Sequence, residues 1–152
     1  MENLIEDINA AFAGLAPPGD DKLLHPECMD DVDVLDFYGG LKREDLSDER
    51  VVYNYAALTA FSAEAFQYYL PRYMVWTLEN RDSIEIAAES LLLALDPGTE
   101  REMLHDFRVS KFALLTAPQV AIVKRFLWHL ADHPDLGEFA DLALVNYWID
   151  RG

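Results

Sequence analysis

Two histidines are the first residues of this sequence whose spacing could support chemistry. His129 and His133 are four apart in a segment of helical periodicity, so one helix would present both rings on the same side. Such a pair can bind a transition metal. However, the segment HLADHP lacks the glutamate that follows the first histidine in zinc-hydrolase helices, and Pro134 places His133 at a helix end. A small metal-binding protein that uses His129 and His133 therefore stays an alternative, and we expect no metal or other cofactor.

Carboxylates gathered in the first third of the chain are the second candidate. We expect these side chains to bind a partner: Asp20, Asp21, Glu27, Asp30, Asp31, Asp33 and Asp36. Clustered carboxylates can also hold a divalent cation, but the Asp-x-Asp-x-Asp-Gly loop of calcium sites is absent. They can equally form a solvated face with no binding role. The partner that fits this surface best is a basic protein.

Aromatic residues are dense between positions 53 and 76, at spacings typical of a helical core. Tyrosine and tryptophan are also common at protein interfaces. Tyr68 lies off the main apolar stripe, so we predict that it is an exposed aromatic contact.

Catalytic motifs are missing from the sequence. It has no Gly-x-Ser-x-Gly elbow and no Walker or dinucleotide glycine pattern. The single cysteine, Cys28, lies among acidic residues, which raise the pKa of a thiol instead of activating it. We therefore predict that the protein is not an enzyme.

The overall composition combines strong acidity with enough apolar residues to fold. The formal net charge is −16, yet 51% of the residues are hydrophobic. Such a surface repels nucleic acid and anionic lipid, so we expect no direct nucleic-acid binding and no membrane association. One cysteine, an acidic N-terminal segment and the lack of a long apolar run predict a cytoplasmic protein.

Helical periodicity dominates the chain, and the runs end at proline or glycine. Three pairs have the spacing of a capping box: Asp82 with Glu85, Thr99 with Glu102, and Thr116 with Gln119. Ser62 can cap a long helix, in which Pro71 predicts a kink or a break. Residues 41–50 are expected to form an exposed loop or one helical turn. We predict an all-α, compact single-domain bundle of about six to seven helices over residues 1–152.

Four stretches have a familiar order: IEDINAAFAG, LTAFSAEAFQYYLPRYM, LLTAPQVAIVKRFLWHL and ALVNYW. They resemble a family of small bacterial proteins of unknown function. Its members tend to show a YYLP-like segment after a capped LT turn, then LT-x-x-Q before a helix, then a terminal YW. The resemblance implies a compact bacterial protein of the cytoplasm and supplies no catalytic residues. The sequence departs from that pattern at residues 41–50, where a tryptophan is common in the family.

Three functions follow from these observations. The leading hypothesis is an acidic protein-interaction module, immunity-like, antitoxin-like or regulatory, that binds a basic protein. One alternative is a nucleic-acid mimic, whose carboxylates imitate phosphates and block a DNA-binding or defence enzyme. The other alternative is the metal-binding protein described above. The oligomeric state does not follow from the sequence.

Overall fold

The computed structural model describes residues 2–28, 32–82 and 86–151, and this part of the chain is all-α, as predicted. Its eight α-helices are α1 (Glu2–Ala11), α2 (Val32–Tyr38), α3 (Asp48–Tyr53), α4 (Ala63–Glu79), α5 (Ile86–Ala94), α6 (His105–Ser110), α7 (Ala117–Leu130) and α8 (Gly137–Asn146). Short 3-10 turns join them: η1 (Asp20–Lys22), η2 (Pro26–Cys28), η3 (Arg43–Asp45), η4 (Ala57–Thr59) and η5 (Trp148–Asp150). The helix count exceeds the predicted one because the charged stretch 41–50 contains η3 and the start of α3.

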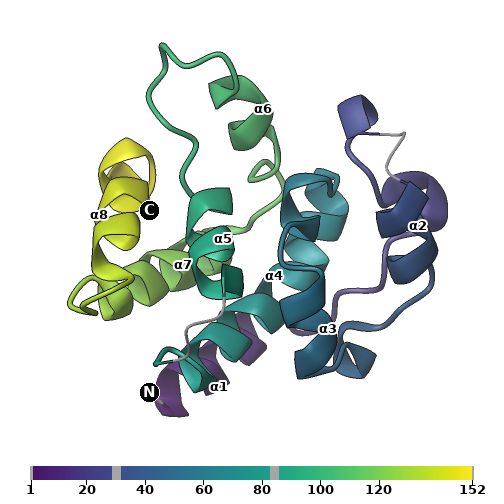
Figure 1. The fold of residues 1–152 in the computed structure, drawn as a ribbon, viewed down its shortest axis with the longest axis horizontal. Helices are drawn as coiled ribbons and strands as arrows, with labels where there is room; N and C mark the ends of the chain where they lie inside the picture. Colours follow the sequence, from purple (N-terminus) through teal and green to yellow (C-terminus); the bar gives the residue numbers. More distant parts are fainter. Residues whose placement is uncertain (1, 29–31, 83–85, 152) are drawn as a thin grey trace.

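Helix α4 is the central element of the molecule, and α1, α3 and α5 all pack against it (Figure 1). It begins as predicted, because the Ser62 hydroxyl accepts a hydrogen bond from the Ala65 N–H at 3.1 Å. Of the kink or break expected at Pro71, the break is excluded, since α4 continues through this residue to Glu79. Pro71 is itself buried, and packing on several sides outweighs the hydrogen bond that a proline nitrogen cannot donate.

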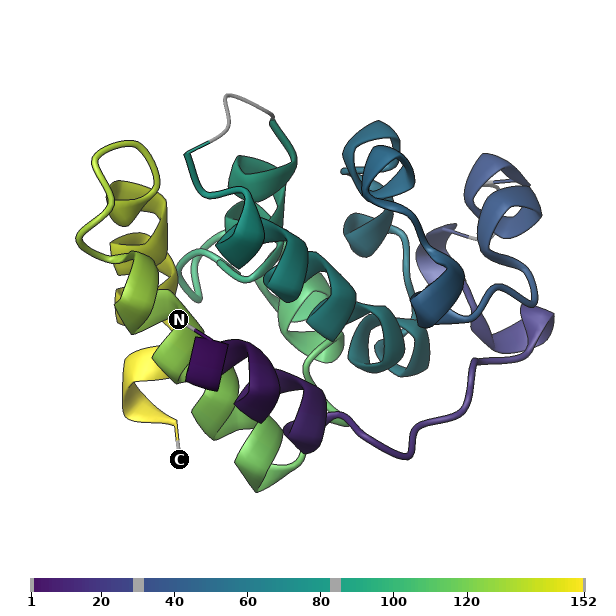
Figure 2. The same cartoon turned by 90° about the horizontal axis from the view of Figure 1, so that it is seen from below.

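Helices α7 and α8 follow one another in the chain and pack together, and α1 lies alongside α7 (Figure 2). The predicted capping box at the start of α7 is confirmed in both directions. The Thr116 hydroxyl accepts from the Gln119 N–H, and the Gln119 side chain accepts from the Thr116 N–H at 3.0 Å. Gln119 also donates to the carbonyl of Ala11 at 3.1 Å, which ties the end of α1 to the start of α7.

The terminal YW pair closes the core after α8. The Trp148 side chain is fully buried, and its indole N–H donates to the Leu95 carbonyl at 2.7 Å. Its ring packs on Phe112 and Tyr147, each with a centroid separation of 4.9 Å. The motif is therefore structural here, because it seals the region where the chain leaves α5.

Helix α6 begins later than the sequence predicts, and it contributes no buried side chain to the core. The spacing of Thr99 and Glu102 predicts the start of a helix, but residues 100–104 form turns and bends and α6 begins only at His105. Glu102 does reach back to the Thr99 N–H at 2.6 Å, but this contact stabilises a turn after Gly98, whose φ is +72°. No residue of α6 is buried.

The other predicted capping pair, Asp82 with Glu85, lies partly outside the described residues, and α5 begins at Ile86. Within the described ranges, the helices lack the combination of length and hydropathy that a bilayer-spanning segment needs.

Candidate functional site

Five of the predicted partner-binding carboxylates gather at one end of the molecule. We call this surface the acidic end and define it by five exposed side chains: Asp20, Asp21, Glu27, Asp33 and Asp36. They come from η1, η2 and α2, which lie together at the end opposite α8 (Figure 1). The predicted Asp30 and Asp31 lie outside the described residues.

The acidic end carries negative charge that the described structure leaves uncompensated. Among the ion pairs of the described residues, none involves any of its five carboxylates. Asp33 and Asp36 are three apart on α2, so their charges repel along one helix face. The carboxylate of Asp20 lies beside Gly39, which directly follows α2. A Cβ atom at this glycine would be only 3.1 Å from the Asp20 Oδ1. Asp20 therefore adds its charge at the end of the helix that carries Asp33 and Asp36.

The basic side chains behave in the opposite way, because many of them bind the fold itself. Arg43, Arg72, Lys111 and Lys124 all donate to main-chain carbonyls, at 2.7 to 3.0 Å. Arg125 pairs with Asp7 at 2.8 Å. Positive charge is consequently used to join segments, while the acidic end faces solvent.

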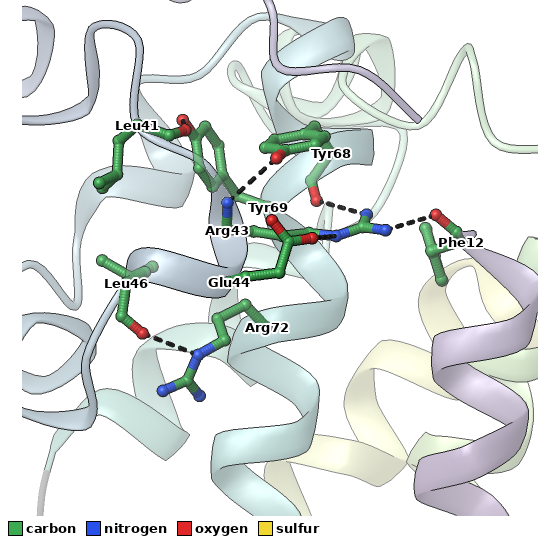
Figure 3. A network of polar contacts seen from close by, with 8 residues as sticks. All are labelled: Phe12, Leu41, Arg43, Glu44, Leu46, Tyr68, Tyr69 and Arg72. Atoms are coloured by element: carbon green, nitrogen blue, oxygen red, sulfur yellow. Dashed lines mark hydrogen bonds and ion pairs between the residues drawn. The ribbon is translucent and has the colours of Figure 1, made fainter. Parts of the chain in front are cut away.

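Arg43 shows this use of positive charge in detail (Figure 3). Its guanidinium donates to the carbonyl of Tyr68 at 3.0 Å and to that of Phe12 at 2.7 Å. The Arg43 N–H donates to the Tyr68 hydroxyl at 3.0 Å, and the guanidinium carbon lies 4.9 Å from the centre of that ring. Arg43 thus fastens η3 to both α1 and α4.

Tyr68 is therefore not the exposed contact that the sequence predicts. The Tyr68 side chain is only 3% exposed, because the Arg43 guanidinium covers its ring and the Arg43 N–H donates a hydrogen bond to its hydroxyl. The residue does lie off the main stripe of α4, but a segment distant in sequence folds over it. The prediction of Tyr68 as an exposed partner-binding residue is wrong.

A groove of about 590 Å³ opens beside the Arg43 network, between α1, η3 and α4. Arg72 lines it and donates to the carbonyl of Leu46 at 2.9 Å and to Asp48 at 2.6 Å. Glu44 and Glu79 line the same groove. Because the arginines are already bound and carboxylates face them, the groove is poorly suited to an anion.

Three tyrosines of the core form a second polar network. The hydroxyls of Tyr38 and Tyr73 share a hydrogen bond, and Tyr73 also donates to the Asn54 carbonyl at 3.1 Å. Tyr69 donates to the Leu41 carbonyl at 2.5 Å (Figure 3). Burial raises the pKa of Tyr38 to about 12 and raises the pKa of both Tyr69 and Tyr73 further. All three remain neutral donors that hold α2 against α4.

His129 and His133 are close in the fold, but their ring nitrogens already have other neighbours. The Nδ1 of His133 accepts from the N–H groups of Asp135 and Leu136, and its Nε2 lies 3.5 Å from an Asp82 oxygen. The Nε2 of His129 lies 3.1 Å from the Arg81 guanidinium. Burial and the Arg81 charge lower the pKa of His129.

A metal at this place would face the cation of Arg81. In the described part of the chain, no three His, Cys, Asp or Glu side chains are grouped so that they could hold a metal ion. The geometry therefore gives the metal-binding alternative no support.

Sequence reasoning missed the contact between the acidic end and α6. The ring of His25, which precedes η2, packs edge-on against Phe107 with 4.5 Å between centroids. Its Nε2 lies 3.2 Å from the Ser110 hydroxyl, and its Nδ1 accepts from the Glu27 N–H at 3.1 Å. Burial and the nearby Lys111 charge lower the pKa of His25. No local pattern signals this contact, since its partners are far apart in sequence.

Comparison with known proteins gives one match. The model of the family described as Family of unknown function (DUF6714) matches residues 1–152, so the chain belongs to this family. The resemblance to a family of unknown function is thereby confirmed. No curated protein and no solved structure matches the chain.

Proposed function

We propose that this member of the DUF6714 family is an acidic interaction protein that captures a basic protein partner through the acidic end. Its role would be that of an immunity-like, antitoxin-like or regulatory protein. The observation that carries the proposal is the separation of charge: basic side chains bind carbonyls and carboxylates of the fold, and the acidic end stays exposed. A surface kept negative in this way attracts a positively charged partner over distances beyond direct contact.

The same separation shapes the kinetics that we expect. Long-range attraction raises the association rate of oppositely charged proteins, and salt screens it. Capture should therefore be fast at low salt and slower at high salt. Residence time must come from a contact that salt does not screen, and Tyr68 is too deeply buried to supply it.

Nucleic-acid mimicry fits the arrangement less well. Carboxylates that imitate a phosphate backbone need regular rows across a surface. Here the described carboxylates of the acidic end lie on three short elements, η1, η2 and α2, at one end of the molecule. We therefore favour a basic protein surface as the target.

The test compares two variants that remove the same charge from opposite ends of the molecule. The acidic-end variant carries Asp20→Asn, Asp21→Asn, Glu27→Gln, Asp33→Asn and Asp36→Asn. The control variant carries Asp132→Asn, Asp135→Asn, Glu138→Gln, Asp141→Asn and Asp150→Asn, all at exposed positions around α8. Each tagged protein is used to capture proteins from its source cells at low and high salt, and mass spectrometry identifies them.

We expect a basic protein to be retained by the unmodified chain and by the control variant, lost with the acidic-end variant, and reduced at high salt. Equal capture by both variants would show that overall charge, and not the acidic end, governs binding. Capture of no basic protein by the unmodified chain would contradict the proposed function itself.

A further inference from the structure

The side chain of His25 joins two segments that are far apart in the chain. Its Nδ1 accepts a hydrogen bond from the Glu27 N–H of η2 at 3.1 Å, and its Nε2 lies 3.2 Å from the Ser110 hydroxyl of α6. The ring also packs edge-on against Phe107 of the same helix, with 4.5 Å between the ring centroids. Because α6 contributes no buried side chain, these contacts are an important part of its attachment to the fold.

The partners of His25 determine which of its nitrogens carries the proton. A backbone N–H can only donate, so Nδ1 must be unprotonated where it accepts from Glu27. The proton of the neutral ring is then on Nε2, which faces Ser110. The Ser110 hydroxyl donates to the Phe107 carbonyl at 2.6 Å, so its oxygen is left to accept from the Nε2–H. One neutral tautomer of His25 thus satisfies all of these groups at once.

Two charged groups of the described residues act on the His25 ring, and they oppose each other. Lys111, just after α6, disfavours the protonated ring, and the Glu27 carboxylate favours it. Lys111 is only 3% exposed, and its ammonium group lies 4.2 Å from the centre of the Phe107 ring, so a protonated His25 would add a second cation beside that ring. The segment whose Ala60 carbonyl accepts from the His25 N–H adds no charge. Burial and Lys111 outweigh Glu27 and hold the pKa of His25 below its ordinary value.

We propose that His25 is a pH-sensitive switch, which holds η2 against α6 while its ring is neutral and releases η2 when the ring is protonated. Protonation places an N–H at Nδ1, where it faces the N–H of Glu27, and two donors cannot form a hydrogen bond. The switch does not depend on the proposed function. Because η2 carries Glu27, however, acid changes the position of one residue of the acidic end.

His133 provides a comparison within the same molecule. Its Nδ1 also accepts from backbone N–H groups, those of Asp135 and Leu136. Its Nε2 lies 3.5 Å from an Asp82 oxygen, whereas the Nε2 of His25 faces a neutral hydroxyl. The amide of Asp135 therefore reports on a second histidine, and a substitution at His25 should leave its response to acid unchanged.

An NMR titration of the full chain from about pH 7.5 to about pH 5 tests the switch. At the upper pH we expect the ring of His25 to carry its proton on Nε2. On acidification the ring should become protonated with a midpoint below 6.5. Over the same range the nuclear Overhauser contacts between His25 and Phe107 should be lost, and the Glu27 amide proton should move upfield as its hydrogen bond breaks.

The variant His25→Gln removes the titrating ring and keeps a polar side chain at this half-buried position. We expect its Glu27 amide to lose the response to acid, while its Asp135 amide responds as in the unmodified chain. A Glu27 amide that still responds as before would overturn the proposal.

The unmodified chain decides the question without any substitution. A neutral His25 ring that carries its proton on Nδ1 would overturn the switch, and so would a protonated ring that keeps its contacts with Phe107. Neither result would bear on the capture of a basic protein, which is measured separately by the two five-site variants.

Discussion

At the scale of single residues, the role of a charged side chain in this protein depends on whether it contacts other protein groups or solvent. Arg43 donates to two carbonyls and lies over an aromatic ring, and it thereby joins η3 to α4 and to the end of α1. Asp36 is exposed to solvent and forms part of the acidic end. His25 is intermediate, because its half-buried ring connects the acidic end to α6 and its protonation is opposed by burial and by Lys111.

His25 should make the protein less stable in mild acid. Burial and the Lys111 charge hold the pKa of His25 in the folded state below its ordinary value of 6.5. Below pH 6.5 the unfolded chain therefore binds a proton at this residue before the folded protein does, and stability falls as the pH decreases. His129 shifts in the same direction. We expect His25→Gln to lose less stability than the unmodified protein between about pH 7.5 and about pH 5.5.

Urea unfolding followed by circular dichroism at the two pH values measures this difference. His129→Gln is the matched variant, and it should likewise weaken the dependence of the free energy of unfolding on pH. An unfolding midpoint of His25→Gln that falls as steeply with acid as that of the unmodified chain would contradict the prediction.

At the scale of elements, α2 shows that the position of a charge on a helix determines its effect. Asp33 lies in the first turn, where the helix dipole favours a carboxylate. Asp36 lies nearer the end at Tyr38, where the dipole disfavours one, and the two residues repel each other. The acidic end is therefore kept at some cost to the stability of α2.

Neutralising the two aspartates should therefore give different results. Asp36→Asn removes an unfavourable dipole contact and a repulsion, so we expect a gain of about 0.5 kcal/mol in the free energy of unfolding. Asp33→Asn relieves the same repulsion but loses a favourable dipole contact, so its effect should stay within about 0.3 kcal/mol of zero. Urea unfolding at low salt measures both, and a larger gain from Asp33→Asn would refute the argument.

The elements were predictable from sequence where local rules determine them. The caps at Ser62 and Thr116 follow from contacts three residues along the chain, and both are present. The prediction that Tyr68 is exposed was wrong, and α4 is not broken at Pro71, because distant segments pack over α4. The His25–Phe107 contact joins residues from distant parts of the chain, so no periodicity could reveal it.

At the scale of the whole molecule, a net charge of −16 acts on stability as well as on binding. Folding brings the carboxylates closer together, and this self-repulsion opposes the compact state. Added salt screens the repulsion. We therefore expect moderate NaCl to raise the melting temperature.

Thermal unfolding across a series of salt concentrations tests this expectation. Both five-site variants described above carry less charge, so their melting temperatures should depend less steeply on salt. A melting temperature of the unmodified protein that falls with added NaCl would show that specific ion pairs outweigh the general repulsion.

The buried Trp148 has a consequence for how the protein is made. Synthesis proceeds from the N-terminus at about 5–20 residues per second. Helix α1 cannot pack against α7 until α7 has been synthesised. The region after α5 likewise lacks its covering side chain until Trp148 has been synthesised. During that interval the apolar surfaces of the growing chain are exposed. Because the acidic end is encoded in the first third of the sequence, we expect like charges on neighbouring unfinished chains to oppose their association before Trp148 has been added.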